Sequence, residues 1–445
     1  MAVAGADEGM DPTRWFDGSS FVPARLGADL KELRPLRPGV GGVLHHFEDG
    51  VWRSDGAYWV AEQVRNLLND RFQKRRLDET LAWLRSEIPT DFGKHARTTS
   101  INCSNGSLYW EDAILSDHTP DQLSRIRIPV KWNPDATCPT VDQYLRDVLP
   151  EDCVGLFLEL LGYLLIPSNQ FQLAVLLLGQ GGTSKTTALR LMRSLLGADN
   201  VSSMSLHRMV EDRFASAELY GKLANISGDL DARSVERSDI FKMVTGGDSL
   251  TAERKYSDPF SFVPFARLIF AANEAPMSTD QSSAYFDRWL VIPMERRFRG
   301  TDSDIPDFAD KLTTTAELEG LLVKAVAGLK RLTARGHFEV PASVREAGDR
   351  HQRDLDSVLS FVDEACSLDS VSWTHRGALY RRYSDWCVSN GRRKLSSRKV
   401  YDRLRGLPAV SETTRDGYAG FRGIAVCDEG IERTREGVEE AWNLR

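Results

Sequence analysis

The chain has 445 residues, more than one ordinary hydrophobic core accommodates, so we expect two or three domains. Hydrophobic residues make up 41% and charged residues 27%, which is normal for a soluble globular protein. No apolar run approaches the roughly 18 residues of a membrane span, and the net charge of −7 argues against a chain that binds nucleic acid along its whole surface.

The N-terminal segment and the cysteines indicate the cellular compartment in which the protein is expected. The opening MAVAGADEGMDPTRWF lacks a basic stretch followed by an apolar run, so we expect no secretion signal, and we expect residues 1–40 to be flexible. The six cysteines are scattered without a C-x-x-C pair, which argues against a zinc ribbon and a disulfide scaffold. A cytoplasmic protein is the plain expectation.

Residues 41–165 read as a mixed α+β domain. Apolar residues at spacings of three and four between residues 55 and 90 predict helix: Val60, Val64, Leu67, Leu68 and Phe72. Asn105-Gly106 predicts a tight turn between two strands. Apolar segments around residues 144–166 predict helices packed under the next domain.

Residues 166–340 have a different pattern of hydrophobic segments. The short apolar runs AVLLL, KLANIS, ARLIFAAN and RWLVIPM alternate with helical segments, which predicts an α/β sheet covered on both faces. Residues 316–335 predict a long helix or a helix pair.

The C-terminal part is expected to comprise a linker or solvated helix over 341–360 and a domain over 361–445. The last 90 or so residues read helix, helix, helix, strand, strand. Between Val371 and Arg405 the chain carries ten Lys or Arg against two Asp or Glu, a local excess of eight positive charges. One end of an acidic protein is therefore strongly basic.

The stretch QLAVLLLGQGGTSKTT, residues 172–187, nearly matches the sequence motif of a phosphate-binding loop. A buried strand, a small-residue loop and a helix follow one another, as G-x-x-x-x-G-K-[ST] requires. The pattern predicts that the loop binds nucleotide phosphate, with Lys185 reaching the β/γ-phosphates and the Thr186 hydroxyl on Mg²⁺. The candidate ATP-binding residues are Gly179, Gly181, Gly182, Thr183, Ser184, Lys185, Thr186 and Thr187. Ser184 stands where the pattern has glycine, and the loop alone also fits a Gly-rich turn between core elements.

Two acids follow the strand KLANIS. An ATPase needs a carboxylate beside Mg²⁺ and a group that orients the attacking water, and Asp229 and Asp231 are candidates for these roles. Acids at alternate positions point the same way if the strand continues. A pair of acids in a surface turn fits the same residues.

Two further residues sit at strand ends. Asn273 ends the strand in ARLIFAANEAP, where it could position water, although a plain strand end reads the same. Arg288 precedes the strand in FDRWLVIPM. It is either a solvated cap or, in a ring of subunits, an arginine that enters the neighbour's site and stabilises transition-state charge.

LTAERKYSDPFSF, residues 250–262, predicts a hairpin. Two short β-like runs flank Arg254, Lys255 and Tyr256, so basic and aromatic side chains would lie at the tip. Such a tip suits a single-stranded DNA backbone, since charge meets phosphate and the ring offers stacking. A solvated hairpin is the alternative.

These elements, in one order and at compatible spacing, resemble the superfamily 3 helicases. The likeness is greatest to the helicase half of phage, plasmid and poxvirus primase-helicases. It rests on GKLANISGDLD, FKMVTGGDSLTAERKYSDPFSF, ARLIFAANEAP and FDRWLVIPM. Upstream, INCSNGSLYW and RIPVKWNPDATCPTVDQYL resemble the domain before the ATPase, and ALYRRYSDWCVSNGRRKLSSRKVYDRL resembles a C-terminal winged helix. The resemblance covers roughly residues 40–425.

The resemblance implies a P-loop AAA+ ATPase core with a winged-helix-like C-terminal domain, in a ring, usually hexameric, that moves 3′ to 5′ on DNA. It assigns Lys185 and Thr186 to phosphate and Mg²⁺. It assigns Asp229, with Asp231, to the acidic strand end. It assigns Asn273 to the polar sensor and Arg288 to the trans-acting arginine. The hairpin residues Arg254, Lys255 and Tyr256 would contact DNA. Leu230 separates acids that are usually adjacent, and no primase domain is recognisable before residue 40, so a separate chain is expected to supply priming.

We therefore expect a cytoplasmic, ATP- and Mg²⁺-dependent DNA helicase that replicates a phage, plasmid or integrated element in a bacterial host. Two rivals remain: a small-molecule kinase with the same loop, and an origin-binding initiator whose ATP site has decayed. The basic C-terminal segment binds either duplex DNA or protein.

Overall fold

The computed structural model describes residues 11–93, 97–212, 214–228, 230, 239–253, 259–274, 282–298, 300, 308–392 and 394–427. The chain forms two compact units, Met1–Arg345 and Glu346–Arg445. Among the described residues, no helix combines the length and the apolar character needed to cross a membrane.

The first unit begins with a small α+β region that has its own core. Its elements are β1 (Phe16–Asp17), β2 (Ser20–Phe21), α1 (Pro23–Leu33), β3 (Leu36–Pro38), β4 (Leu44–Glu48), β5 (Val51–Arg53), α2 (Gly56–Leu68) and α3 (Lys74–Arg85). Trp15, Leu26 and Leu30 are fully buried in this core, so the expectation of a flexible segment is wrong for residues 11–40. Residues 1–10 lie outside the described part of the chain.

The helical pattern between residues 55 and 90 corresponds to two helices, α2 and α3. Val60, Val64 and Leu68 line the buried face of α2, as their spacing predicts. Phe72 does not belong to that face, because it lies between the helices with 38% of its surface exposed.

A second three-stranded sheet and two helices complete the N-terminal half. They are β6 (Ser100–Cys103), β7 (Gly106–Tyr109), β8 (Ile114–Ser116), α4 (Pro139–Val148) and α5 (Cys153–Leu164). The predicted turn between two strands is present, but Cys103 pairs with Gly106, so the turn residues are Ser104 and Asn105. The turn therefore lies one residue earlier than the sequence indicated. The predicted helices near residues 144–166 are α4 and α5.

The central element is a five-stranded parallel sheet in the order β10-β11-β14-β9-β15. Its strands are β9 (Ala174–Leu178), β10 (Val201–Ser202), β11 (Ala224–Ser227), β14 (Arg267–Ala272) and β15 (Trp289–Pro293). Every residue of β14 and β15 is buried, as expected for strands covered on both faces. This confirms the predicted α/β character.

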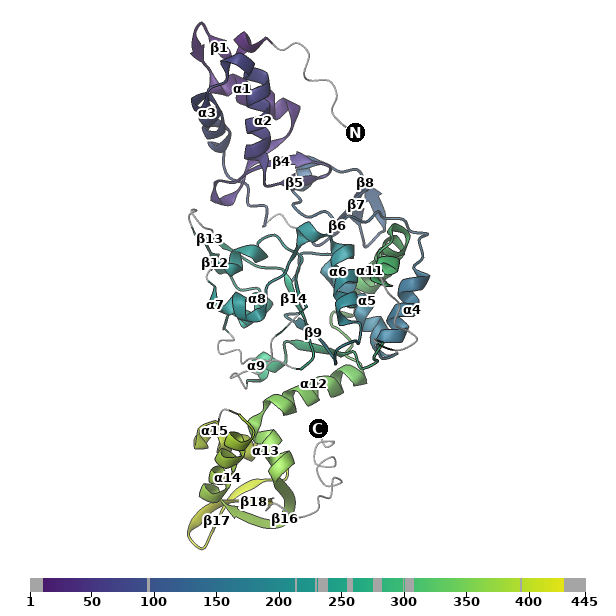
Figure 1. Cartoon of the computed structure of the whole chain (residues 1–445), viewed down its shortest axis with the longest axis vertical. Helices are drawn as coiled ribbons and strands as arrows, with labels where there is room; N and C mark the ends of the chain where they lie inside the picture. Colours follow the sequence, from purple (N-terminus) through teal and green to yellow (C-terminus); the bar gives the residue numbers. More distant parts are fainter. Residues whose placement is uncertain are drawn as a thin grey trace. The chain divides into compact units, whose positions relative to one another are not determined.

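Helices and one hairpin surround this sheet. They are α6 (Lys185–Leu196), α7 (Leu206–Glu211), α8 (Asp239–Gly246), β12 (Leu250–Ala252), β13 (Phe260–Phe262), α9 (Ser283–Phe286), α10 (Phe308–Leu312) and α11 (Thr315–Arg335). Figure 1 shows α5, α6 and α11 on one side of β9 and β14, with α7 and α8 on the other. Residues 316–335 form a single helix, α11, which packs along α5.

A buried arginine fixes the start of the central strand β14. Arg267 is 1% exposed and donates to the carbonyls of Leu164 and Ile166, both at 2.6 Å, of Phe265 at 2.8 Å, and of Ser168 at 3.1 Å. These bonds tie the chain after α5 to β14 and satisfy carbonyls that leave the helix end.

The second unit begins inside α12 (Ala342–Leu355). It then contains α13 (Ser357–Ala365), β16 (Cys366–His375), α14 (Arg376–Ser389), α15 (Ser397–Arg405), β17 (Ser411–Arg415) and β18 (Tyr418–Val426). The charged stretch predicted as a linker or solvated helix is thus helical. The sequence reading missed β16, which pairs with β18 in a sheet of order β16-β18-β17. Its residues Ser367–His375 are mostly exposed and polar, so alternation is weak there.

Candidate functional site

The loop after β9 lies at the edge of the sheet where its parallel strands end. Leu178 pairs with Ala272 of β14 and with Pro293 of β15, so three strand ends meet beside Gly179. The Gly179 amide donates to the Ala272 carbonyl at 3.2 Å. In open parallel sheets, ligands bind outside this carboxyl edge.

Gly179 is required by close packing. A Cβ at this position would lie 2.0 Å from the backbone oxygen of Met294, far closer than real contacts allow. At Gly181, in contrast, an added Cβ would meet nothing within 4 Å. The two glycines of the loop therefore have different reasons to be small.

The loop turns into α6 through residues with left-handed backbone. Gly182 has φ of 86°, and Ser184, which precedes the first residue of α6, has φ of 64° and ψ of 16°. An L-residue in this region costs roughly 1–2 kcal/mol, a cost that glycine avoids. The conformation explains why the loop pattern has glycine where this chain has Ser184.

Lys185 points back into the loop. It is 9% exposed, and its Nζ donates to the Gly179 carbonyl, to the Gln180 carbonyl at 2.8 Å and to Thr183 Oγ1 at 3.4 Å. A fourth bond, of 3.0 Å, reaches Asn273 Oδ1. Burial lowers the pKa of the Lys185 ammonium below its usual value. All four of these acceptors are neutral oxygens, so the bonds leave the positive charge of the ammonium uncompensated.

The threonines of the motif lie at different depths. Thr183 is 2% exposed and its hydroxyl donates to the Gln180 carbonyl at 2.9 Å, which closes the loop. Thr186 is exposed on the first turn of α6, and Thr187 is half-buried. The first amides of a helix have no intrahelical partner and carry partial positive charge, which favours an anion beside Thr186.

Two residues that sequence reasoning missed hold the loop from outside. The Tyr144 hydroxyl, on α4, donates to the Ser184 carbonyl at 3.1 Å, and the Phe298 amide donates to the Gly182 carbonyl at 2.9 Å. Both residues are distant from the loop in sequence: Tyr144 lies in the upstream segment RIPVKWNPDATCPTVDQYL, and Phe298 follows FDRWLVIPM. Only the tertiary fold brings them to the loop, so no local signal could have identified them.

Asn273 and Arg288 lie at opposite ends of the strands of the parallel sheet. The structure brings Asn273 to Lys185, at the carboxyl edge of the sheet. Arg288 immediately precedes Trp289, which pairs with Ala174 at the beginning of β9, while the loop follows the end of β9. With a rise of about 3.3 Å per residue, Arg288 is on the order of 13 Å or more from the loop of its own chain.

Several predicted site residues fall outside the described residues. Asp229 and Asp231 are two of them, and so are the hairpin residues Arg254, Lys255 and Tyr256. Leu230 is described between the two acids: it is 3% exposed, and its amide donates to the Ala271 carbonyl at 3.1 Å. The chain after β11 thus runs beside the end of β14. The strands of the predicted hairpin are present as β12 and β13, paired from Leu250–Phe262 to Ala252–Phe260.

Within the described part of the chain, no group of three or more His, Cys, Asp or Glu residues could hold a metal ion. Of the two residues predicted to bind Mg²⁺, the structure describes Thr186, and Asp229 is outside the described residues.

Two family models match separate parts of the chain. Residues 37–150 match the family described as D5 N terminal like, and residues 177–288 match a family of unknown function, DUF5906. The second match contains the loop, Lys185 and Asn273. It begins inside β9 and ends at Arg288.

Two curated relatives come from viruses. A putative helicase of Acanthamoeba polyphaga mimivirus is 25% identical over 210 residues, which covers 44% of this chain and 22% of the relative. A putative helicase of Invertebrate iridescent virus 3 is 22% identical over 311 residues, covering 61% of this chain and 33% of the relative. The chain thus spans between about a fifth and a third of the length of these relatives.

Solved structures match over nearly the whole chain. Two apo A-form structures of the C-terminal region of NrS-1 superpose with TM-scores of 0.52 and 0.50, at 13% and 11% identity. Each match covers 91% of this chain and 99% or more of the other. At this identity the likeness concerns the fold. The chain is thus similar, over part of its length, to two viral putative helicases, and a D5 N-terminal-like region precedes the parallel sheet.

Proposed function

We propose that the chain is an ATP-dependent DNA helicase with an AAA+ core, which replicates a viral, plasmid or integrated genome. One observation carries the proposal: a loop at the carboxyl edge of a parallel sheet encloses the buried ammonium of Lys185, which also contacts the polar strand-end residue Asn273. That arrangement suits phosphate binding, because the cation and the first amides of α6 face one site. The similarity to viral putative helicases supports action on nucleic acid.

The residues present fit a nucleotide with its Mg²⁺. The loop amides and Lys185 would hold the phosphates, and Thr186 with Asp229 would hold Mg²⁺. Bound ATP would supply the free energy of phosphoryl transfer. Asn273 or Asp231 would orient the attacking water, and Arg288 of a neighbouring subunit would stabilise the charge that develops.

DNA contact is assigned to two regions. Arg254, Lys255 and Tyr256, which lie between β12 and β13 in the sequence, would hold a single strand in the channel of a hexameric ring that moves 3′ to 5′. The second unit has the order α13-β16-α14-α15-β17-β18, which fits a winged helix. Arg398 and Lys399 of α15 are exposed, and no ion pair to them is present among the described residues, so this helix is the duplex-binding candidate. A cytoplasmic site of action and a separate primase belong to the same proposal.

The decisive experiment compares ATP hydrolysis by the wild type, Lys185→Ala and the control Lys311→Ala, with and without single-stranded DNA. Lys311 is an exposed lysine of α10, so its loss removes equal charge without touching the loop. We expect DNA-stimulated hydrolysis in the wild type and in Lys311→Ala, and none in Lys185→Ala. DNA binding without any turnover would favour an initiator with a decayed site. Turnover that needs a small-molecule acceptor would favour a kinase.

A further inference from the structure

A pocket separate from the loop lies where the D5 N-terminal-like region meets the parallel-sheet region. It encloses about 620 Å³ of non-atom space, part of it open to solvent. One wall comes from residues 92–126 and the other from residues 165–167, 220–221 and 265. Both belong to the first compact unit. The nucleotide loop contributes no residue to it.

The charge of the lining is one-sided. Arg97 and Arg125 line the pocket, and among the described residues that line it there is no Asp or Glu. This is unusual in a chain whose net charge is −7. A guanidinium group such as that of Arg97 suits a phosphate, which arginine binds through paired donors.

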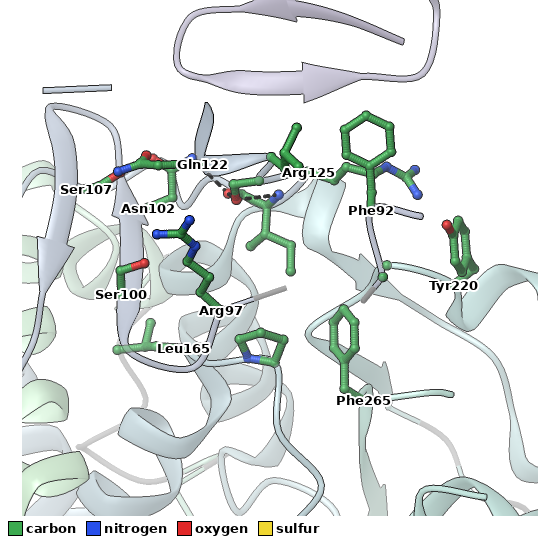
Figure 2. Close-up of a pocket in the computed structure, with 16 residues that line it drawn as sticks. Phe92, Arg97, Ser100, Asn102, Ser107, Gln122, Arg125, Leu165, Tyr220 and Phe265 are labelled. Carbon is green, nitrogen blue, oxygen red and sulfur yellow. Dashed lines mark hydrogen bonds between the residues drawn. The ribbon is translucent and has the colours of Figure 1, made fainter. Parts of the chain in front are cut away.

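Aromatic and polar side chains gather on different sides of the pocket, and the aromatic side draws on both walls. Figure 2 shows the rings of Phe92, Tyr220 and Phe265 on one side of the pocket and Arg97, Ser100 and Asn102 on the other. Arg125 lies with its guanidinium carbon 4.9 Å from the centre of the Tyr220 ring. Flat aromatic and guanidinium surfaces are the ones on which nucleic-acid bases stack.

Asn102 supplies a fixed acceptor. It is 8% exposed, and its Nδ2 donates to the carbonyls of Gly50 at 2.8 Å and Ile126 at 3.0 Å. These bonds set the orientation of the amide. Its Oδ1 is buried and has no hydrogen-bond partner among the described residues. Buried acceptors are almost always paired, so this oxygen is suited to an N–H of a ligand.

The pocket also contacts the predicted DNA hairpin. The Tyr220 ring packs edge-on against Phe260 and Phe262 of β13, each with ring centres 5.3 Å apart. Tyr220 therefore contacts both Arg125 and the hairpin strand β13.

We propose that this pocket binds one nucleotide of single-stranded DNA. The base lies between Phe265 and the Arg125–Tyr220 stack and donates to Asn102 Oδ1, and Arg97 holds a phosphate. The inference rests on the proposed action on DNA, but it does not depend on ATP hydrolysis. The same chemistry would accept a free nucleotide, and the experiment separates the two sources.

The test measures binding of fluorescein-labelled oligo(dT) of about 20 nucleotides to the full chain by anisotropy, without ATP, at several salt concentrations. Arg97→Ala removes an exposed charge, and Lys131→Ala is the matched control, an exposed lysine of the same region outside the pocket. We expect Arg97→Ala to raise Kd roughly fivefold or more and to reduce the salt slope by about 0.7. Lys131→Ala should retain the wild-type values.

A second variant, Arg125→Lys, keeps the charge but loses the flat stacking surface, so it should also weaken binding. Thermal unfolding of each variant establishes that it is folded. If Arg97→Ala binds oligo(dT) as Lys131→Ala does, the proposal is wrong. Displacement of the oligonucleotide by millimolar dTMP, with the same dependence on Arg97, would instead assign the pocket to free nucleotides. A chain without ATPase activity but with Arg97-dependent binding would refute the helicase proposal and leave this one intact.

Discussion

Lys185 Nζ lies 3.0 Å from Asn273 Oδ1, which joins the first residue of α6 to the end of β14 across 88 positions of sequence. The bond places Asn273, the predicted polar sensor, beside Lys185, the residue predicted to bind phosphate. Because Asn273 accepts from an ammonium group, the bond is charge-assisted and stronger than a neutral one.

The first prediction concerns Asn273→Ala. A hydrogen bond to a charged group is worth about 1.5–3 kcal/mol, so its loss should reduce kcat for ATP roughly ten- to a hundredfold. The KM for ATP should change much less, because the loop and Lys185 remain. Steady-state kinetics with single-stranded DNA measure both. A raised KM with unchanged kcat would mean that Asn273 only orients Lys185 in the ground state.

Ser184→Gly should stabilise the loop. The left-handed backbone at Ser184 costs a non-glycine residue roughly 1–2 kcal/mol, and no described side-chain bond caps α6 there to offset it. The free energy of unfolding in urea should therefore rise by about 1 kcal/mol, less the entropy that glycine adds to the unfolded chain. ATP hydrolysis should be unchanged or faster.

Ser184→Ala is the control for this experiment, since it removes the hydroxyl and keeps the backbone cost. Loss of activity in both variants would show that the Ser184 hydroxyl takes part in the site. Loss in the glycine variant alone would show that the site needs the rigidity of a side chain here.

Gly179→Ala and Gly181→Ala form a matched pair within one loop. The new methyl group at Gly179 would lie 2.0 Å from the Met294 carbonyl, whereas the one at Gly181 would meet nothing within 4 Å. We expect Gly179→Ala to lower the free energy of unfolding by about 1–3 kcal/mol or more and to abolish nucleotide binding. Gly181→Ala should remain as stable as the wild type. Thermal unfolding and binding of a fluorescent ATP analogue measure the two effects, and equal losses would contradict the assigned contact.

The sequence predicted the parts of this site that are local. A strand, a small-residue loop and a helix are adjacent in the chain, so β9, the loop and α6 could be inferred from hydrophobic pattern and the loop motif. Asn273 could be located at a strand end from the sequence, and its place beside the loop was expected from the family resemblance. Sequence could not reveal that Ser184 adopts a left-handed backbone, since serine seldom does, nor that Tyr144 donates to its carbonyl. The pocket was equally hidden, because its walls come from four separate segments. The strand β16 was not predicted because its exposed residues show little alternation of hydrophobic and polar side chains.

Arg288 should act only between subunits. It precedes β15 at the edge of the sheet opposite to the loop, so it cannot reach Lys185 of its own chain. Lys185→Ala and Arg288→Ala should each be inactive alone. In an equimolar mixture that exchanges subunits, roughly a quarter of the interfaces would combine an intact Lys185 with an intact Arg288, and hydrolysis should recover in proportion. A mixture that stays inactive would mean that both residues serve the same subunit or that no exchange occurs, which labelled subunits would reveal.

His351 should make the second unit sensitive to mild acid. It is 2% exposed on α12, and burial lowers its pKa to about 4 from the ordinary 6.5. The unfolded chain therefore binds a proton at a higher pH than the folded chain does. The stability contributed by the neutral, buried ring is complete above pH 6.5 and is lost as the pH falls towards 4. The free energy of unfolding should decrease by up to about 1.4 kcal/mol per pH unit in this window. Urea unfolding between pH 5 and 7 measures the slope, and His351→Leu provides the comparison. Its slope should be shallower than that of the wild type, because leucine binds no proton in either state, and equal slopes would assign the acid sensitivity to other groups.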